Sequence, residues 1–265
     1  PLQRAVSSAL RAAPGAAPGQ CRVTAVAHHL TAEQVHSMLS VEQRAVVDVI
    51  ESEDRGSTAA VPRNEALRRT SARYISFLDS DDTLDPGAVT RWLRIAERRG
   101  SDLVMPFQHH ENPRVDITPI VRPLRRSDLD PVKDRLGYRS SAFGLVRVDA
   151  ARQMGARFDE SVRTGEDQSF VMALYAGSRR IDSAPGTPGY LVHADAVFAR
   201  ALAKNPADRF ASCSEFAAAL AQAVEIASTA PSVVAAQAPG RPFSPPLPTQ
   251  QAPVHPVAHL SLIHI

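Results

Sequence analysis

The chain has 265 residues, of which 44% are hydrophobic and 22% are charged, and its formal net charge is +2. This composition is ordinary for a globular domain with an appendage, and the low charge argues against bulk electrostatic binding to nucleic acid. Two cysteines far apart in sequence, Cys21 and Cys213, favour a reducing cytoplasmic location over a disulfide framework. No apolar run approaches the roughly 20 residues that a membrane-spanning helix needs.

The first part of the chain alternates between helical and extended patterns, which predicts an α/β fold with a mostly parallel sheet flanked by helices. Helices are expected at 2–12, 31–39, 63–70 and 86–99. Strands are expected at 22–28, 45–50, 74–78 and 103–106.

The second part of the chain is less regular, and a polar, Pro-rich stretch at 109–133 predicts an irregular insertion. Beyond it we expect strands at 141–148, 180–183 and 189–193, and helices at 149–154 and 166–176. Ala-rich patterns at 196–203 and 214–224 predict a short helical pair. From residue 229 onward the chain is rich in Pro, Ala and Gln, which is typical of disorder.

The most informative segment is Tyr74-Ile75-Ser76-Phe77-Leu78-Asp79-Ser80-Asp81-Asp82, an apolar strand pattern that ends in three acids. On a continuing strand Asp79 and Asp81 would face the same way. Two hard oxygen ligands side by side suit Mg²⁺ or Mn²⁺ shared with phosphate oxygens. A solvated acidic turn after a strand is the alternative, and this segment alone favours that alternative.

Four other segments accompany this one in a fixed order. They are Asp54-Arg55-Gly56-Ser57, Arg63-Asn64-Glu65-Ala66-Leu67, Arg157-Phe158-Asp159-Glu160 and Thr164-Gly165-Glu166-Asp167-Gln168-Ser169-Phe170. In order and spacing the set resembles the family-2 glycosyltransferases of the GT-A fold, over roughly residues 1–193. The family's first strand is expected before Leu2, so the resemblance implies an N-terminally truncated domain.

The resemblance also implies roles for single residues. Asp81 would ligate a Mn²⁺ or Mg²⁺ ion that bridges the donor diphosphate, and Asp79 would share the metal site and meet the donor ribose or sugar. Asp82 would support these two acids without itself contacting the metal. Arg63 and Asn64 would lie near the nucleotide. Taken alone, Arg63 is equally well a surface residue at a helix start.

Asp167 matches the family's general base, which would deprotonate an acceptor hydroxyl for an inverting displacement at the anomeric carbon. Without the resemblance, Glu166 and Asp167 are more simply acids that stabilise the start of a helix. The implied enzyme is a hexosyltransferase that takes a UDP-, GDP- or dTDP-sugar as donor. The implied acceptor is a glycan, a polyol or a lipid-linked acceptor, which leaves peripheral attachment to the inner face of the membrane open.

A second resemblance covers residues 197–216, which read V-F-A-R-A-L-A-K-N-P-A-D-R-F and then E-F. They resemble the end of a bacterial Ser/Thr protein kinase domain, so residues 194–228 are interpreted as a kinase remnant. A phosphate-binding loop and a catalytic Asp are missing, which excludes phosphoryl transfer. The last seven residues resemble translated sequencing-adaptor tails, and residues 229–265 are expected to be disordered.

Taken together, these features predict a chimeric chain. The alternative function that the second resemblance leaves open is a kinase-derived, non-catalytic interaction module.

Overall fold

The computed structural model describes residues 1–16, 20–53, 58–110, 115–117, 122, 124–138, 144–162, 164–186, 189–193, 212 and 258–263. The chain divides into two compact units, Pro1–His193 with Pro256–Ile265 and Ala194–His255. All of the elements below belong to the first unit. Apart from Ser212, the expected helical pair and kinase remnant lie outside the described residues, as does the segment 54–57.

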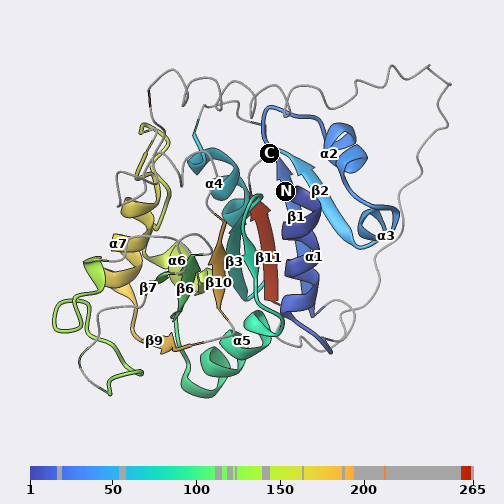
Figure 1. The fold of residues 1–265 in the computed structure, drawn as a ribbon. Coiled ribbons are helices and arrows are strands. Elements are labelled where there is room, and N and C mark those ends of the chain that lie inside the picture. The colour runs from blue at the N-terminus through green and yellow to red at the C-terminus, as the bar shows by residue number, and fades with distance from the viewer. Residues whose placement is uncertain are drawn as a thin grey trace, which may run out of the picture. The chain divides into compact units, whose positions relative to one another are not determined.

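Helices surround the central strands (Figure 1). They are α1 (Leu2–Ala12), α2 (Ala32–Met38), α3 (Val41–Arg44), α4 (Ala60–Arg69), α5 (Ala88–Arg99), α6 (Val148–Gln153), α7 (Asp167–Gly177) and the 3₁₀ turn η1 (Leu136–Tyr138). The strands are β1 (Cys21–Ala27), β2 (Val47–Glu51), β3 (Tyr74–Asp79), β4 (Thr83–Leu84), β5 (Leu103–Pro106), β6 (Gln108–His110), β7 (Val115–Ile117), β8 (Leu145–Arg147), β9 (Ile181–Ala184), β10 (Tyr190–Val192) and β11 (Ala258–Ile263).

The larger sheet has seven strands in the order β2-β1-β11-β3-β8-β5-β9. Only β8 runs against its neighbours, so β3, β5 and β9 point the same way. The prediction of a mostly parallel sheet flanked by helices is therefore confirmed. Parallel strands bring their carboxyl ends to one edge of the sheet, and that edge is where ligands bind in open α/β folds.

The strand β11 overturns part of the prediction for the C-terminal tail. Residues 258–263 are not disordered but form a strand between β1 and β3, parallel to both (Figure 1). Leu260 pairs with Val23 on one side and with Ser76 on the other. In this interior position the segment has a partner strand on each side, and its apolar residues of high β-propensity suit such a place.

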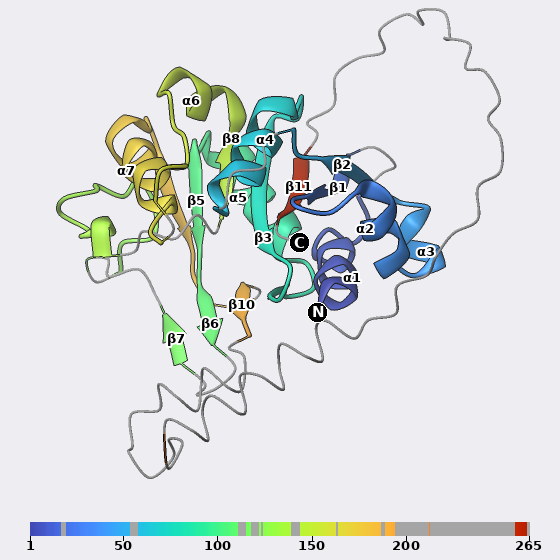
Figure 2. The same cartoon turned by 90° about the horizontal axis from the view of Figure 1, so that it is seen from above.

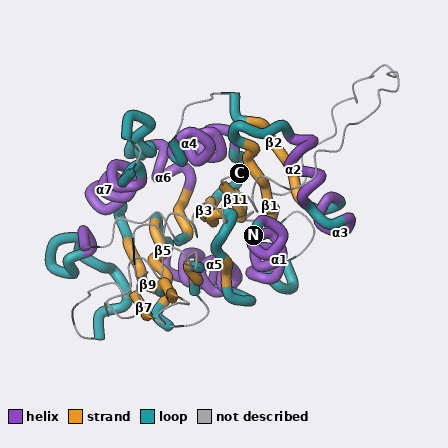
Figure 3. Tube along the Cα trace, turned by 45° about the horizontal axis from the view of Figure 1, so that its top comes forward, coloured by secondary structure: helices purple, strands orange, loops and turns teal. Residues whose placement is uncertain are grey.

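The central strand β3 shows how the sheet is buried on both faces. Tyr74 and Leu78 pack into one hydrophobic cluster with α1 and α5, whereas Ile75 and Phe77 pack into a second cluster with α4, α6 and α7. This division follows from the alternation of side chains along a strand. Figure 3 shows the same two groups of helices on opposite sides of the strands.

A smaller sheet, in the order β4-β10-β6-β7, lies beside the carboxyl end of the larger one. Figure 2 shows β6 continuing outward from β5, with β7 and β10 on either side of it. The expectation of a wholly irregular insertion at 109–133 is therefore wrong for β6 and β7, which pair as an antiparallel ladder. Strands of only three residues are too short to leave a clear periodic signal in a sequence.

Most other elements begin and end within three residues of their expected positions. Within the part of the chain that the structure describes, no helix has the length and apolar character to cross a bilayer.

Candidate functional site

The acids at the tip of β3 lie in three different environments. The strand ends at Asp79, and a turn follows in which the backbone N–H of Asp82 donates to the carbonyl of Asp79 at 3.1 Å. The expectation that Asp79 and Asp81 share one face of a continuing strand is wrong, because Asp81 lies in this turn. Asp81 is exposed, Asp79 is half-buried and Asp82 is buried.

A buried arginine joins the acidic tip to a helix that is distant in sequence. The Nη2 atom of Arg63 lies 2.7 Å from Oδ1 of Asp79, and its Nη1 atom lies 2.9 Å from Oε1 of Glu166. The Arg63 side chain is 8% exposed and its guanidinium lies over the ring of Phe158. Burial alone would lower the pKa of Arg63, but Asp79, Glu166 and Asp167 together raise it.

Asn64, the next residue on α4, holds the segment that contains Phe158. Its amide nitrogen donates to the carbonyl of Phe158 at 3.0 Å and to Oε1 of Glu160 at 2.6 Å. Its amide oxygen accepts from the backbone N–H of Phe158 at 3.0 Å. These bonds use the side chain internally, so contact of Arg63 or Asn64 with a nucleotide stays a prediction.

Three phenylalanines pack together and join β3, the segment around Phe158 and α7. Phe158 stacks on Phe170 with ring centroids 4.2 Å apart, and both rings meet the edge or face of Phe77 in β3. All three rings are almost fully buried. Aromatic pairs of this geometry add roughly 0.5–1.5 kcal/mol each beyond their buried area. The apolar residues of the sequence motifs thus hold the polar ones in place.

The predicted base, Asp167, is the first residue of α7. Gly165 adopts a φ of 77° just before it, a conformation that favours glycine, and the turn presents Glu166 and Asp167 toward Arg63. Glu166 forms the ion pair with Arg63, while Asp167 is half-buried and contributes to raising the pKa of Arg63. The structure therefore brings Asp79, Arg63 and the Glu166–Asp167 pair together.

Asp82 belongs to a network that the sequence did not reveal. Tyr190 donates its hydroxyl to Oδ2 of Asp82 at 2.8 Å, and the backbone N–H of His193 donates to Oδ1 at 2.9 Å. The Tyr190 hydroxyl also accepts from the backbone N–H of Asp79 at 3.1 Å. Burial raises the pKa of Asp82 to about 7, although both hydrogen bonds act in the opposite direction.

The residues at the tip suit a divalent metal only if a ligand supplies further oxygens. Among the described residues, no group of three or more His, Cys, Asp and Glu side chains could hold a metal ion. Asp79 already gives one oxygen to Arg63, which leaves its second oxygen and the exposed carboxylate of Asp81. Mg²⁺ commonly binds through one or two carboxylates together with substrate phosphates, and this donor set fits that pattern.

Comparison with solved structures defines the class of fold. The structure of residues 1–349 of S. aureus TarS in complex with UDP-GlcNAc superposes with a TM-score of 0.63 at 19% identity, covering 72% of this chain and 55% of that one. The corresponding complex with UDP superposes equally well, at 18% identity, covering 77% of this chain and 62% of that one. The fold is therefore that of the GT-A glycosyltransferases.

Comparison of sequences shows which proteins the chain is similar to. Residues 31–155 match the model of the family Glycosyl transferase family 2. A poly(ribitol-phosphate) beta-glucosyltransferase of Bacillus spizizenii is 27% identical over 150 residues. The succinoglycan biosynthesis protein ExoM of Rhizobium meliloti is 30% identical over 139 residues.

These alignments are partial on both sides. They cover 56% of this chain and 24% of the first relative, and 49% of this chain and 43% of the second. The chain thus spans less than half the length of the curated relatives it matches. No comparison supports the interpretation of residues 194–228 as a kinase remnant, or that of the chain as a chimera.

Proposed function

We propose that the chain belongs to an enzyme that transfers a sugar from a nucleotide-diphosphate donor to an acceptor hydroxyl with inversion. The observation that carries the proposal is the Arg63 bridge. One buried guanidinium binds Asp79, from the segment expected to meet the donor, and Glu166, the neighbour of the expected base. Donor and base must lie close together for a direct displacement, and this bridge supports such an arrangement.

In this reaction the acceptor oxygen attacks the anomeric carbon, and the bond from that carbon to the nucleotide diphosphate breaks. Asp167 takes the acceptor proton, a role that its half-buried position at the start of α7 permits. Asp79 and Asp81 would hold a Mn²⁺ or Mg²⁺ ion, which neutralises charge on the leaving diphosphate. Arg63 and Asn64 keep the donor and base segments at a fixed separation.

The donor is proposed to be a UDP-sugar and the acceptor a polyol-phosphate polymer. Two similar structures are named as complexes with UDP-GlcNAc and UDP. The Bacillus relative and the Staphylococcus aureus relatives are named for transfer to poly(ribitol phosphate). At 23–27% identity these names suggest the class of donor and acceptor, and the sugar itself stays open.

The test is sugar transfer from labelled UDP-glucose or UDP-GlcNAc to a ribitol-phosphate oligomer in the presence of Mn²⁺. Asp167→Asn should lower turnover by roughly 10²–10⁴-fold, with little change in UDP affinity. The matched control is Asp149→Asn, because Asp149 is likewise an acid in the first turn of a helix, α6, and lies outside the candidate site. Equal turnover in both variants would show that Asp167 only stabilises its helix.

A further inference from the structure

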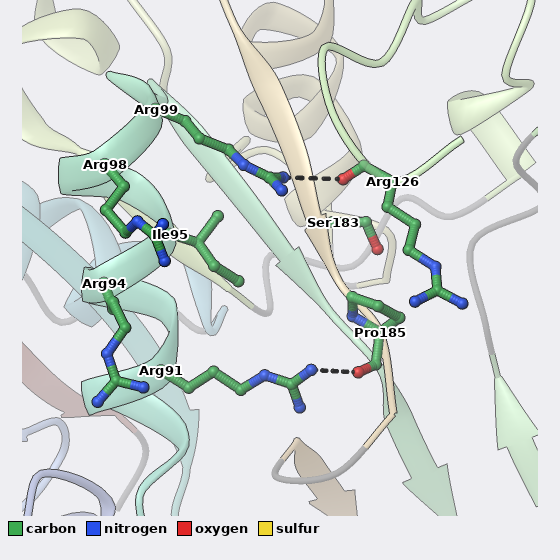
Figure 4. A pocket seen from close by; sticks show the side chains of 8 residues that line it. All are labelled: Arg91, Arg94, Ile95, Arg98, Arg99, Arg126, Ser183 and Pro185. Atoms are coloured by element: carbon green, nitrogen blue, oxygen red, sulfur yellow. Dashed lines mark hydrogen bonds between the residues drawn. The ribbon is translucent and has the colours of Figure 1, made fainter. Parts of the chain in front are cut away.

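Five arginines line one cavity outside the candidate site. The cavity has a volume of about 480 Å³ and lies between α5 and the chain around the end of β9 (Figure 4). Its arginines are Arg91, Arg94, Arg98, Arg99 and Arg126. Among the residues that the structure describes, no carboxylate lines it. A concave surface with this charge attracts anions more strongly than scattered surface arginines do.

The helix α5 explains why the arginines gather. Its apolar residues Ala88, Val89, Trp92 and Ala96 are buried against the sheet. Arg91, Arg94 and Arg98 follow one another at intervals of three and four residues, which places them along one side of the helix. Like charges at this spacing destabilise a helix by roughly 0.2–0.5 kcal/mol per pair, so the row carries a small cost.

Two of the five arginines build the wall of the cavity. Nη1 of Arg99 lies 3.2 Å from Oδ1 of the fully buried Asp182, and Nη2 of Arg91 donates to the carbonyl of Pro185 at 2.6 Å. Figure 4 shows this second bond at one end of the row, with the bond from Arg99 to the Arg126 carbonyl at the other. These contacts tie α5 to the β9 side of the cavity.

The other three guanidinium groups belong to Arg94, Arg98 and Arg126, which are exposed. Within the described ranges no carboxylate pairs with any of them. Glu97, the acid on the same helix, instead pairs with Arg73 at 3.0 Å. Three cationic groups on one cavity therefore remain available to an anionic ligand.

The cavity also reaches the edge of the sheet where the candidate site lies. Because β3 and β9 point the same way, Pro185 after β9 is at the same edge as Asp79 at the end of β3. From Pro185 the chain leads within five residues to Tyr190, whose hydroxyl contacts Asp79 and Asp82. A long ligand could therefore extend from the row of arginines toward the acids.

We propose that the cavity lined by these five arginines, called the arginine groove below, binds phosphate groups of the polyol-phosphate acceptor while a hydroxyl of the acceptor reaches the site of transfer. Guanidinium groups bind phosphate through paired, charge-assisted hydrogen bonds, and a row of them suits a repeating anion. The inference rests on the proposed function, and it adds a binding region that lies apart from the reacting groups.

The test measures binding of a fluorescent ribitol-phosphate oligomer to the full chain by anisotropy across a range of salt concentrations. The variant Arg94→Gln/Arg98→Gln should weaken binding at least tenfold, and it should lower the slope of log affinity against log salt by about 2, one for each lost phosphate contact. The control Arg11→Gln/Arg135→Gln removes the same charge from exposed residues outside the groove. Equal losses in both variants, or undiminished binding by the groove variant, would overturn the proposal.

Two further measurements separate the groove from the proposed function. UDP affinity and hydrolysis of the UDP-sugar in the absence of acceptor should be unchanged in Arg94→Gln/Arg98→Gln, because neither residue contacts the candidate site. An unmodified chain that binds the oligomer but not UDP would refute the proposed function and leave the inferred groove unaffected.

Double-stranded DNA with the same number of phosphates should compete only weakly with the oligomer for binding. If it competes equally, the groove is a general polyanion surface and the assignment to an acceptor is wrong.

Discussion

Replacement of Arg63 tests how the site is held together. In Arg63→Gln the carboxylates of Asp79 and Glu166 lose the guanidinium that lies 2.7 and 2.9 Å from them. The side chains of Arg63, Asp79 and Glu166 are only 8%, 23% and 15% exposed, so water compensates little. Removing one partner of a buried ion pair costs roughly 3–5 kcal/mol, and the partial exposure of Asp79 favours the lower end. We expect a loss of about 3 kcal/mol in the free energy of unfolding.

The assay is urea unfolding of the full chain followed by circular dichroism. The control is Arg73→Gln, which breaks the more exposed pair between Arg73 and Glu97 and should cost at most about 1 kcal/mol. Arg63→Lys should fall between the two, since an ammonium keeps the charge but cannot donate to both carboxylates in the same planar geometry. A loss in Arg63→Gln no larger than that of the control would refute the view that Arg63 joins the two motifs.

Three other changes have distinct expected results. Folding raises the pKa of Asp82 to about 7, so protonated Asp82 stabilises the folded state below about pH 4, and up to about 4 kcal/mol of this stability is lost as the pH rises to 7. Asp82→Asn should flatten this part of the pH–stability curve. An unchanged slope would place the titrating group elsewhere. Ser261→Pro removes a backbone donor from β11 between two strands and should lower the melting temperature by several degrees, whereas no change would argue against the pairing of β11 with β1 and β3. Asp81→Asn should weaken UDP binding, measured by calorimetry, in the presence of Mn²⁺ but not in its absence. Equal weakening in both conditions would show that Asp81 does not ligate the metal.

The sequence predicted the regular part of the fold because its signals are local. Apolar alternation in β3 and the amphipathic pattern of α5 each lie within a dozen residues, and the structure has both elements where they were expected. The resemblance also assigned Asp79 and Asp167 to one reaction. It did not predict that Arg63 joins Asp79 to Glu166, because these partners of Arg63 are 16 and 103 residues away in sequence.

Other features depended on long-range contacts with weak local signals. Tyr190 and His193 come from a short strand, and nothing in their own segment indicates that Asp82 is their partner. The strand β11 was assigned to a disordered tail because its neighbours in sequence are rich in Pro and Gln. Its partners, β1 and β3, are distant in sequence, so no local pattern predicts the pairing. The arginine groove likewise combines α5 with the chain near β9.

The most direct test of the proposed activity is a proton NMR time course of the chain with an α-configured UDP-sugar, Mn²⁺ and a ribitol-phosphate oligomer. We expect the anomeric signal of the donor to be replaced by that of a β-linked product, and Asp167→Asn to slow this conversion by at least a hundredfold. An α-linked product, release of free sugar alone, or an equal rate in the variant would contradict the proposed function.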